Sequence, residues 1–264
     1  MRPGDVGALE LVRHGRIEVQ GRLVDASNAT LFGSISHEGV RAEAVYKPIR
    51  GERPLWDFPD GTLAGREVAS YLVSEATGWG LVPPTALRDG PFGPGMVQLW
   101  VDVEPEADLV DVIAPDEVQP GWRRVLEAHD RFGDPAVLAH ADHPSMRLLA
   151  VLDVVLNNAD RKGGHVLHAK DGAVYGVDHG ICLHHEDKLR TVLWGWIGEE
   201  LPEQVAEVLT VLRERLAGDL GGALAEHLTR KEIRATEDRI SRLLETGVFP
   251  QPSGDWPAIP WPAF

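Results

Sequence analysis

The sequence contains a single cysteine, Cys182, so it cannot form an internal disulfide bond. The neighbours of Cys182 in "GICLH" are apolar, and we expect this residue to be a small part of the core. No stretch approaches the roughly 20 apolar residues that a membrane span requires. The first residues, "MRPGDVGALELVRHGR", lack the apolar core of a signal peptide. We therefore expect a soluble, cytoplasmic protein.

Basic residues are also scarce, since 26 Lys and Arg stand against 41 Asp and Glu and leave a formal charge of -15. No dense cluster of Lys and Arg is visible along the chain. This balance disfavours binding to nucleic acid and stable association with an anionic membrane. The chain has 264 residues and 43% hydrophobic content, enough for one larger domain or two small lobes.

The first hundred residues are typical of a small sheet with one helix. Short, partly alternating runs between Ile17 and Pro48 predict antiparallel strands, broken at residues 25–28 and 37–39. A loop rich in Pro, Gly and charge follows at residues 49–61. The segment "LAGREVASYLVSEATG" then predicts a helix that ends near Gly78.

The rest of the chain has a different pattern. The segment "VPPTALRDGPFGPGMVQLWVDV" predicts two more strands, whereas Val118–Asn158 and Pro202–Gly247 have mainly helical periodicity. The tail "FPQPSGDWPAIPWPAF" is too rich in proline for either element. Between the helical regions, Asp160 and Asp178 each follow a run that predicts a buried element, and such loops commonly carry chemistry.

The stretch "ADRKGGHVLHAKDGAVYGVDHG" resembles the catalytic and metal-binding loops of the phosphatidylinositol 3-/4-kinase family. In that family an Asp-Arg pair is followed, five residues after the Asp, by an Asn, and a later strand ends in Asp-x-Gly. Here Asp160-Arg161 takes the first place, His165 stands at the Asn position, and Asp178-His179-Gly180 takes the last. Upstream, "SNATLFGSIS", "AVYKP" and "VQLWV" resemble the phosphate-loop hairpin, the ATP-lysine strand and the hinge of the type II phosphatidylinositol 4-kinase and HipA-like branches.

The resemblance spans roughly Leu23 to Leu201, and the chain is further identified as a member of a small actinobacterial kinase-related family with no assigned substrate. It implies a two-lobed protein-kinase-like fold of the α+β class. Residues 1–101 would form a β-rich N-lobe, and residues 102–264 a mainly helical C-lobe. The implied activity is ATP-dependent phosphoryl transfer with Mg²⁺ or Mn²⁺.

The same resemblance implies a role for each matching residue. Lys47 would contact the α/β-phosphates, and Glu67 would hold Lys47 in place. Asp160 would orient or deprotonate the acceptor hydroxyl, while Asp178 and His165 would bind metal. Nucleotide binding would fall to the phosphate loop and the hinge, that is, to Ser27, Asn28, Gln98, Leu99, Trp100 and Val101.

Three departures from the family pattern affect the metal and the activity. Lys162 replaces the residue after Asp160-Arg161 that is often His. A nitrogen ligand at His165 suits Mn²⁺ better than Mg²⁺. His179 replaces the family's aromatic residue between the metal-binding Asp and Gly. A nucleotide-binding pseudokinase or adaptor is therefore an alternative, with the Pro/Trp-rich tail as its candidate protein-binding strip. For the tail we favour packing of Trp256 and Trp261 onto the helical lobe, and we also expect Trp194 and Trp196 to be packed.

A second alternative is a metal-dependent phosphohydrolase, suggested by His165, His168, Asp178, His179, His184 and His185. Each candidate also has an ordinary structural interpretation, since most lysines are solvated and Asp commonly occupies turns. For the kinase, we expect a soluble acceptor. A protein Ser or Thr hydroxyl, including the enzyme's own, ranks ahead of a small metabolite, and a phosphoinositide ranks last.

Overall fold

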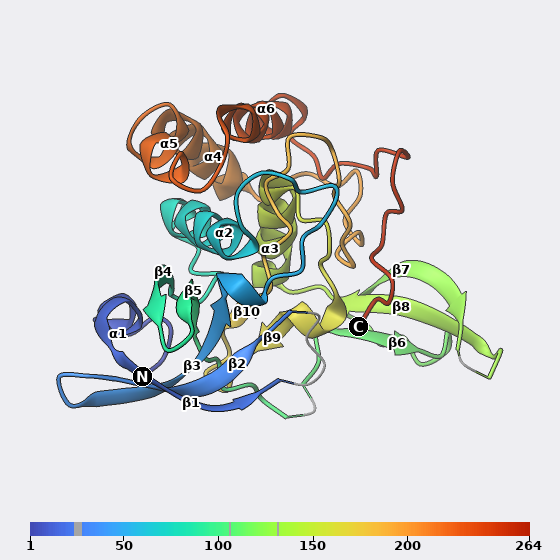
Figure 1. The fold of residues 1–264 in the computed structure, drawn as a ribbon. Coiled ribbons are helices and arrows are strands. Elements are labelled where there is room, and N and C mark those ends of the chain that lie inside the picture. The colour runs from blue at the N-terminus through green and yellow to red at the C-terminus, as the bar shows by residue number, and fades with distance from the viewer. Residues whose placement is uncertain (24–27, 106, 131) are drawn as a thin grey trace.

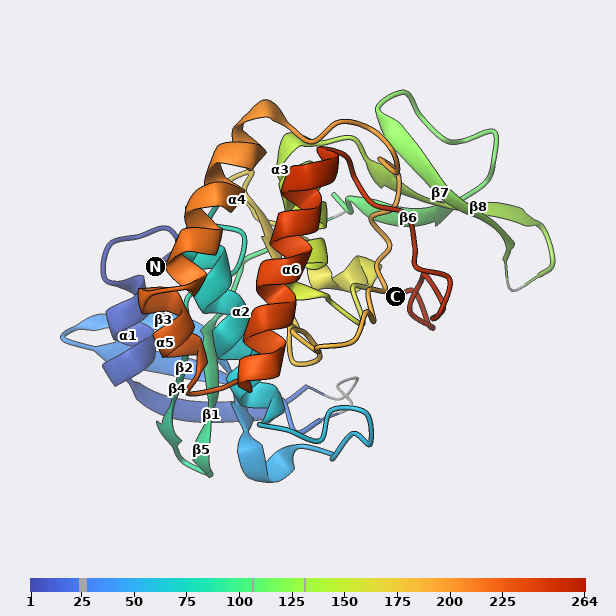
Figure 2. The ribbon, with the colours of Figure 1, turned by 90° about the horizontal axis from the view of Figure 1, so that it is seen from above.

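The computed structural model describes residues 1–23, 28–105, 107–130 and 132–264. The protein is of the predicted α+β class, and Figures 1 and 2 show how its elements are arranged. A five-stranded sheet is formed within the first hundred residues, and a three-stranded sheet is formed in the middle of the chain. Both sheets border a group of helices that contains most of the core.

The first sheet is antiparallel throughout, in the order β1-β2-β3-β5-β4. Glu38 and Gly39 take positive φ values of 47° and 82° at the tight turn between β2 and β3, which confirms the predicted break there. Residues 25–27 of the other predicted break lie outside the described residues. The predicted strands are confirmed as β1 (Arg16–Arg22), β2 (Leu31–His37), β3 (Val40–Pro48), β4 (Thr85–Gly90) and β5 (Gly93–Leu99). Helix α1 (Ala8–His14), which was not predicted, packs against this sheet.

Helix α2 (Leu63–Thr77) is the predicted single helix of this region. The Thr62 side chain caps its first turn by accepting from the Gly65 N–H, and Gly78 ends it with a φ of 70°. The helix is buried on almost every side. Val68 packs with Met96 of the sheet, whereas Val73 belongs to the core of the C-terminal helices. Helix α2 therefore joins the sheet to the helical part of the molecule.

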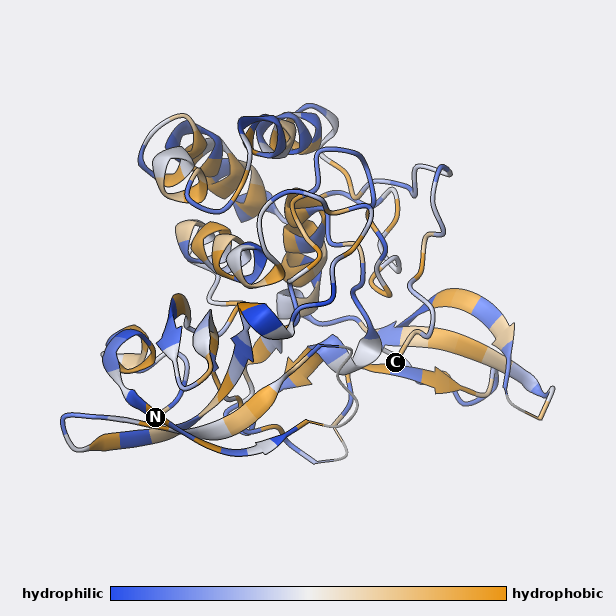
Figure 3. Cartoon of the chain, viewed as in Figure 1, coloured by the Kyte–Doolittle hydropathy of each residue, from blue (hydrophilic) through white to orange (hydrophobic). Residues whose placement is uncertain are grey.

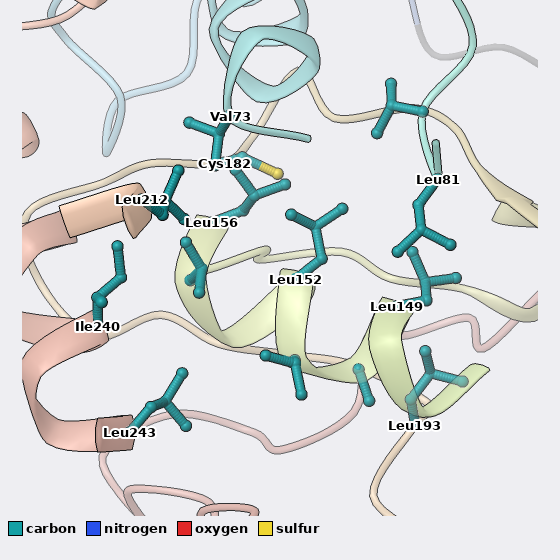
Figure 4. Close-up of a cluster of buried hydrophobic side chains, with 14 of the residues drawn as sticks. Val73, Leu81, Leu149, Leu152, Leu156, Cys182, Leu193, Leu212, Ile240 and Leu243 are labelled. Carbon is teal, nitrogen blue, oxygen red and sulfur yellow. The ribbon is translucent and has the colours of Figure 1, made fainter. Parts of the chain in front are cut away.

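The main core is formed by helices that pack around α3. Figure 4 shows leucines of α3, such as Leu152 and Leu156, in one cluster with Val73 of α2 and with Leu212 and Ile240 of the later helices. Cys182 lies fully buried in the same cluster, as predicted. The helices are α3 (Pro144–Leu156), α4 (Glu203–Leu216), α5 (Asp219–Leu224) and α6 (Arg230–Thr246), which confirms the helical prediction for residues 202–247.

The prediction of mainly helical structure for Val118–Asn158 is wrong for its first half. Residues 110–141 form a sheet in the order β6-β8-β7, and only α3 is helical in the predicted segment. Asp130 accepts hydrogen bonds from the N–H groups of Phe132 and Asp134, and Gly133 has a φ of 88°. This turn chemistry closes a hairpin that overrides the helix-forming Leu, Glu and Ala of the strand before it. The strands are β6 (Val110–Ile113), β7 (Trp122–His129) and β8 (Pro135–Ala141).

The tail has neither helix nor strand between residues 250 and 264, as its proline content predicts. Its packing onto the helices is only partly confirmed. The Trp256 ring lies 4.0 Å from Lys188 Nζ, but Trp261 is 92% exposed, so the packing expected for Trp261 is wrong. Trp194 and Trp196 are both buried, as expected.

Figure 3 shows hydrophilic residues interspersed with hydrophobic ones along α4 and α6. Among the described residues, none of the helices is both long enough and apolar enough to cross a bilayer.

A buried ion pair connects α2 to α6. Arg66 Nη2 lies 2.6 Å from Glu232 Oε1, and the two side chains are almost fully buried. Glu232 also accepts from the N–H of Thr229 in a capping box at the start of α6. Burial tends to raise the pKa of Glu232, but the bonds from Thr229 and Arg66 hold it below its ordinary value of 4.5.

We predict that Glu232→Gln lowers the free energy of unfolding by about 3 kcal/mol at pH 7, because Arg66 becomes a buried charge without a partner. The contribution of a carboxyl group with a lowered pKa is present above its unfolded pKa and is lost as the pH falls. The difference between the variant and the wild type should therefore shrink below about pH 4.5. Urea unfolding of both proteins at several pH values measures this difference in the free energy of unfolding.

Glu245→Gln, at an exposed position of the same helix, is the matched control and should change stability by no more than about 0.5 kcal/mol. Equal stability of the two variants at pH 7 would show that the Arg66–Glu232 pair does not hold α2 against α6.

Candidate functional site

Three elements that are distant in sequence meet at one lysine. Lys47 is on β3, Glu67 is on α2, and Asp178 follows the short strand β10 (Val174–Gly176). Lys47 Nζ lies 2.6 Å from Glu67 Oε1 and 2.7 Å from Asp178 Oδ1. The structure thus brings together three residues that the sequence proposed as one site.

The charges of the three groups depend on one another. Burial alone would lower the pKa of Lys47, but the carboxylates of Asp178 and Glu67 outweigh it and raise that pKa. The charge of Lys47 in turn lowers the pKa of Asp178. Burial raises the pKa of the Glu67 carboxyl, and Lys47 opposes that rise. The contact between Lys47 and Asp178 is therefore an ion pair at neutral pH.

The backbone of residues 178 and 179 also takes part in this site. Glu67 Oε2 accepts a hydrogen bond of 2.9 Å from the His179 N–H, so the same carboxyl group positions both Lys47 and the segment after β10. Asp178 has a φ of 62°, which is uncommon for a residue other than glycine and merits a functional explanation. This backbone bend occurs at the residue whose carboxylate meets Lys47.

Asp160 lies just beyond the end of α3. Asn157 ends that helix with a φ of 51°, and the Asn158 side chain accepts from the Asp160 N–H. The Asp160 carboxylate is about one-quarter exposed and lies 3.4 Å from Lys162 Nζ. Burial raises the pKa of Asp160, although Lys162 opposes that effect. A carboxyl group in this state can accept a proton more readily than an exposed one.

Arg161 fixes the loops that carry these acids. Its buried guanidinium forms an ion pair with Asp153 of α3 and donates to the carbonyl oxygens of His165 and Val177. Arg161 Nη2 also lies 2.7 Å from His179 Nε2. The roles of Arg161 and Asp153 were not predicted from the sequence. The signal available was an aspartate inside the apolar run "LLAVLDVVL", since a buried charge needs a partner.

His165 faces the Asp178 carboxylate from the helical side. It belongs to the short 3-10 helix η2 (Gly163–His165), which leads into β9 (Val166–His168). Its Nδ1 lies 3.0 Å from the Asp160 carbonyl oxygen and its Nε2 lies 3.3 Å from Asp178 Oδ2. Burial lowers the pKa of His165 to about 4, so the ring is neutral at pH 7. With its proton on Nδ1 toward the carbonyl oxygen, Nε2 turns a lone pair to the carboxylate.

His165 Nε2 and Asp178 Oδ2 are both of the types that bind divalent metal ions, and with the opposite tautomer Nε2 would instead donate a hydrogen bond to the carboxylate. Within the described residues, no three His, Cys, Asp or Glu side chains gather to hold a metal by themselves. Two of the histidines nominated for a phosphohydrolase site are engaged elsewhere. His179 contacts Arg161, and His184 Nδ1 accepts from the Glu186 N–H.

Two adjacent cavities share Lys47 and Asp178. The first, of about 370 Å³, is largely apolar and includes the four predicted hinge residues, Gln98–Val101. The Gln98 side chain is held by Thr85, and the Trp100 N–H donates to the Glu43 carbonyl oxygen. The N–H of the buried Val101 has no hydrogen-bond partner in the described parts of the chain.

The second cavity, of about 340 Å³, is lined by Asn28, Glu67 and Asp160 beside the shared pair. Asn28 is therefore placed at the site, whereas Ser27 lies outside the described residues. The loop between β3 and α2, which begins with the short 3-10 helix η1 (Ile49–Gly51), contributes Glu52, Arg53 and Leu55 to the lining of this cavity.

The end of the tail reaches the Asp160 loop, which the sequence did not indicate. The Gly163 N–H donates to the Ala263 carbonyl oxygen at 2.8 Å. The Phe264 ring covers Gly163 so closely that a Cβ atom there would lie 2.2 Å from it. Figure 1 shows the C-terminus beside this part of the chain.

Comparison with known proteins shows a relative that covers nearly the whole chain. No protein-family model matches the chain. Protein Rv2133c of Mycobacterium tuberculosis (strain ATCC 25618 / H37Rv) is 53% identical over 260 residues, which cover 95% of this chain and 93% of that protein. The chain belongs to the same protein family as Protein Rv2133c.

Proposed function

We propose that this protein is an ATP-dependent phosphotransferase, with a two-lobed protein-kinase-like fold divided near residue 101. The observation that carries the proposal is the double contact of Lys47 with Glu67 and Asp178. In protein kinases, a lysine on the third strand pairs with a glutamate on the following helix, and a metal-binding aspartate must also be in place. Here Lys47 is on β3, Glu67 is on the next α-helix, α2, and Asp178 follows strand β10.

We assign the nucleotide base to the first cavity and the phosphate acceptor to the second. The apolar first cavity suits an adenine ring, and it is lined by Val101, whose N–H has no partner among the described residues. Lys47 lies where the two cavities meet and would bind the α/β-phosphates, held there by Glu67. His165 and Asp178 would hold a divalent metal ion, which supplies positive charge against the phosphate oxygens.

Asp160 would act on the acceptor in the second cavity. In the proposed reaction, the acceptor hydroxyl oxygen forms a bond to the γ-phosphorus, the bond from that phosphorus to the β,γ-bridging oxygen breaks, and ADP leaves. Asp160 would orient the hydroxyl group and receive its proton, a role that its raised pKa favours. Arg161 keeps the Asp160 loop in register with the Asp178 segment through its bonds to His165 and Val177.

The proposed acceptor is soluble and cytoplasmic: a protein Ser or Thr hydroxyl, including the enzyme's own, ahead of a small metabolite and a phosphoinositide. The formal charge of -15 supports this order, because it opposes stable binding to anionic lipid. A nucleotide-binding pseudokinase is the second candidate. The specific observation in its favour is that the Lys162 ammonium group lies 3.4 Å from the Asp160 carboxylate. Its charge opposes the rise that burial causes in the pKa of Asp160 and so weakens that group as a base.

We predict transfer of label from γ-labelled ATP in the presence of Mn²⁺, first by the protein alone, then with cell lysate, and then with inositol-lipid vesicles. Asp160→Asn should lower transfer by about 100-fold or more, since a general base contributes at least that much. Lys47→Met should lower it comparably, and Lys170→Met, at an exposed lysine outside both cavities, should retain it.

Label on protein that disappears with Asp160→Asn is the expected outcome. Label found only in the lipid fraction would contradict the proposed acceptor. If ATP binds but no fraction acquires label, the pseudokinase is the better description.

We also predict that His165 sets the metal preference. The wild type should be more active with Mn²⁺ than with Mg²⁺, because a nitrogen ligand favours the softer ion. His165→Asn restores an oxygen ligand and should shift the ratio of the two activities toward Mg²⁺. Initial rates over a concentration series of each metal measure that ratio.

His129→Asn, at an exposed position on β7, should leave the ratio of the activities unchanged. An unaltered metal profile in His165→Asn would show that His165 has only a structural role.

A further inference from the structure

A third cavity, of about 350 Å³, lies away from Lys47, between α6, the C-terminal end of α3, and the first residues of the tail. It shares no residue with the two cavities of the candidate site. Most of its wall is apolar and includes Val154, Leu189, Trp194, Leu243 and Phe249. Figure 2 shows α6 and the tail on the same side of the molecule.

A buried arginine without an acidic partner lines this cavity. Arg239 is only 6% exposed, and no carboxylate oxygen lies within 4.0 Å of its guanidinium in the residues that the structure describes. Its side chain donates to Val155 O, His184 O and Thr236 Oγ1 at 3.0, 3.2 and 2.8 Å. An arginine has five N–H donors, so two of them remain for another acceptor.

The pKa of Arg239 reflects the unfavourable burial of its charge. Burial, together with the charge of Arg242, lowers the pKa of Arg239 to about 10, and the more distant charges of Asp187 and Asp238 only partly oppose this. A buried charge without a counterion is unfavourable. An anion that entered the cavity would relieve this cost, and the site would therefore select for negative charge.

The charged groups that line the cavity are mainly basic. Arg242, one turn further along α6, is exposed and lines the same cavity. Asp187 also lines it, and Asp187 Oδ1 accepts from the Leu189 N–H at 3.4 Å. The residues that line the cavity thus include two arginines and one aspartate, and Asp238, which does not line it, is a second acid near Arg239.

We propose that this cavity binds a small anionic amphiphile, with its carboxylate, sulfonate or phosphate head at Arg239 and Arg242 and its apolar body against Trp194 and Phe249. A mostly apolar cavity with a few convergent polar groups is the usual form of a small-molecule site. The charged groups determine the sign of the head, and the volume limits the ligand to a single small molecule.

The ligand would stabilise the base of the Asp160 loop. Asn157 lines the cavity, and its side chain donates to the His184 carbonyl oxygen, which also accepts from Arg239. Asn157 Oδ1 accepts from the Lys188 N–H as well. An occupied cavity would thus hold α3, α6 and residues 184–188 together at Asn157. Asn157 lies only three residues before Asp160. This binding does not depend on the proposed kinase activity.

Calorimetric titration of the full chain with three probes of equal chain length tests the proposal: octanoate, octan-1-ol and octyltrimethylammonium. Octanoate should bind most tightly, the alcohol more weakly, and the cation least. Arg242→Gln should weaken octanoate binding by about tenfold, the usual effect of removing one charged hydrogen bond. Arg234→Gln, at an exposed arginine of the same helix outside the cavity, is the matched control and should bind octanoate like the wild type.

A second variant does not alter any charge. Thr246→Trp places a large side chain at an exposed position that lines the cavity, and it should abolish octanoate binding. Equal affinity for the three probes, equal effects of Arg242→Gln and Arg234→Gln, or full binding by Thr246→Trp would each overturn the proposal. Absence of octanoate binding to the wild type up to millimolar concentrations would also overturn it.

Discussion

The ammonium group of Lys47, shared between Glu67 and Asp178, is the interaction on which the candidate site depends. It joins the five-stranded sheet, helix α2 and the segment after β10, and it lies at the boundary of two cavities. Without a bound anion, the two carboxyl groups satisfy the lysine. Under the proposed function, the phosphates of a nucleotide would compete for the same charge, and the arrangement would be preorganised for an anion and its metal ion.

Two buried ion pairs keep this arrangement in place. Arg161 and Asp153 connect α3 to the Asp160 and Asp178 segments, and Arg66 and Glu232 connect α2 to α6. A buried pair is weak evidence for stability as such, but loss of one partner is costly. The resulting rigidity holds Glu67 beside Lys47 and Asp160 beside the second cavity. Helix α2 is thereby fixed both to the sheet and to the helical core.

Short-range patterns predicted much of this structure, including the first sheet, α2 and the C-terminal helices. The contact of Lys47 with Glu67 was predicted from a family resemblance, because composition and periodicity carry no information on contacts so distant in sequence. The ion pair of Lys47 with Asp178 was not predicted, since the resemblance assigned Asp178 to metal. Strands β7 and β8 were missed, since their Leu, Glu and Ala suit a helix and only the pairing with a neighbouring strand decides otherwise. The partners of Arg161 and the contact of Phe264 with Gly163 are likewise tertiary.

The most direct test of the account is calorimetric titration of the folded wild type with ATP in the presence of Mg²⁺ and, separately, of Mn²⁺. The account predicts binding of one ATP per chain, weakened at least about tenfold in Lys47→Met through the loss of a charged phosphate contact, and nearly unchanged in Asp160→Asn. Absence of ATP binding by the wild type with both metals would contradict the central claim that the Lys47 cluster is a nucleotide site.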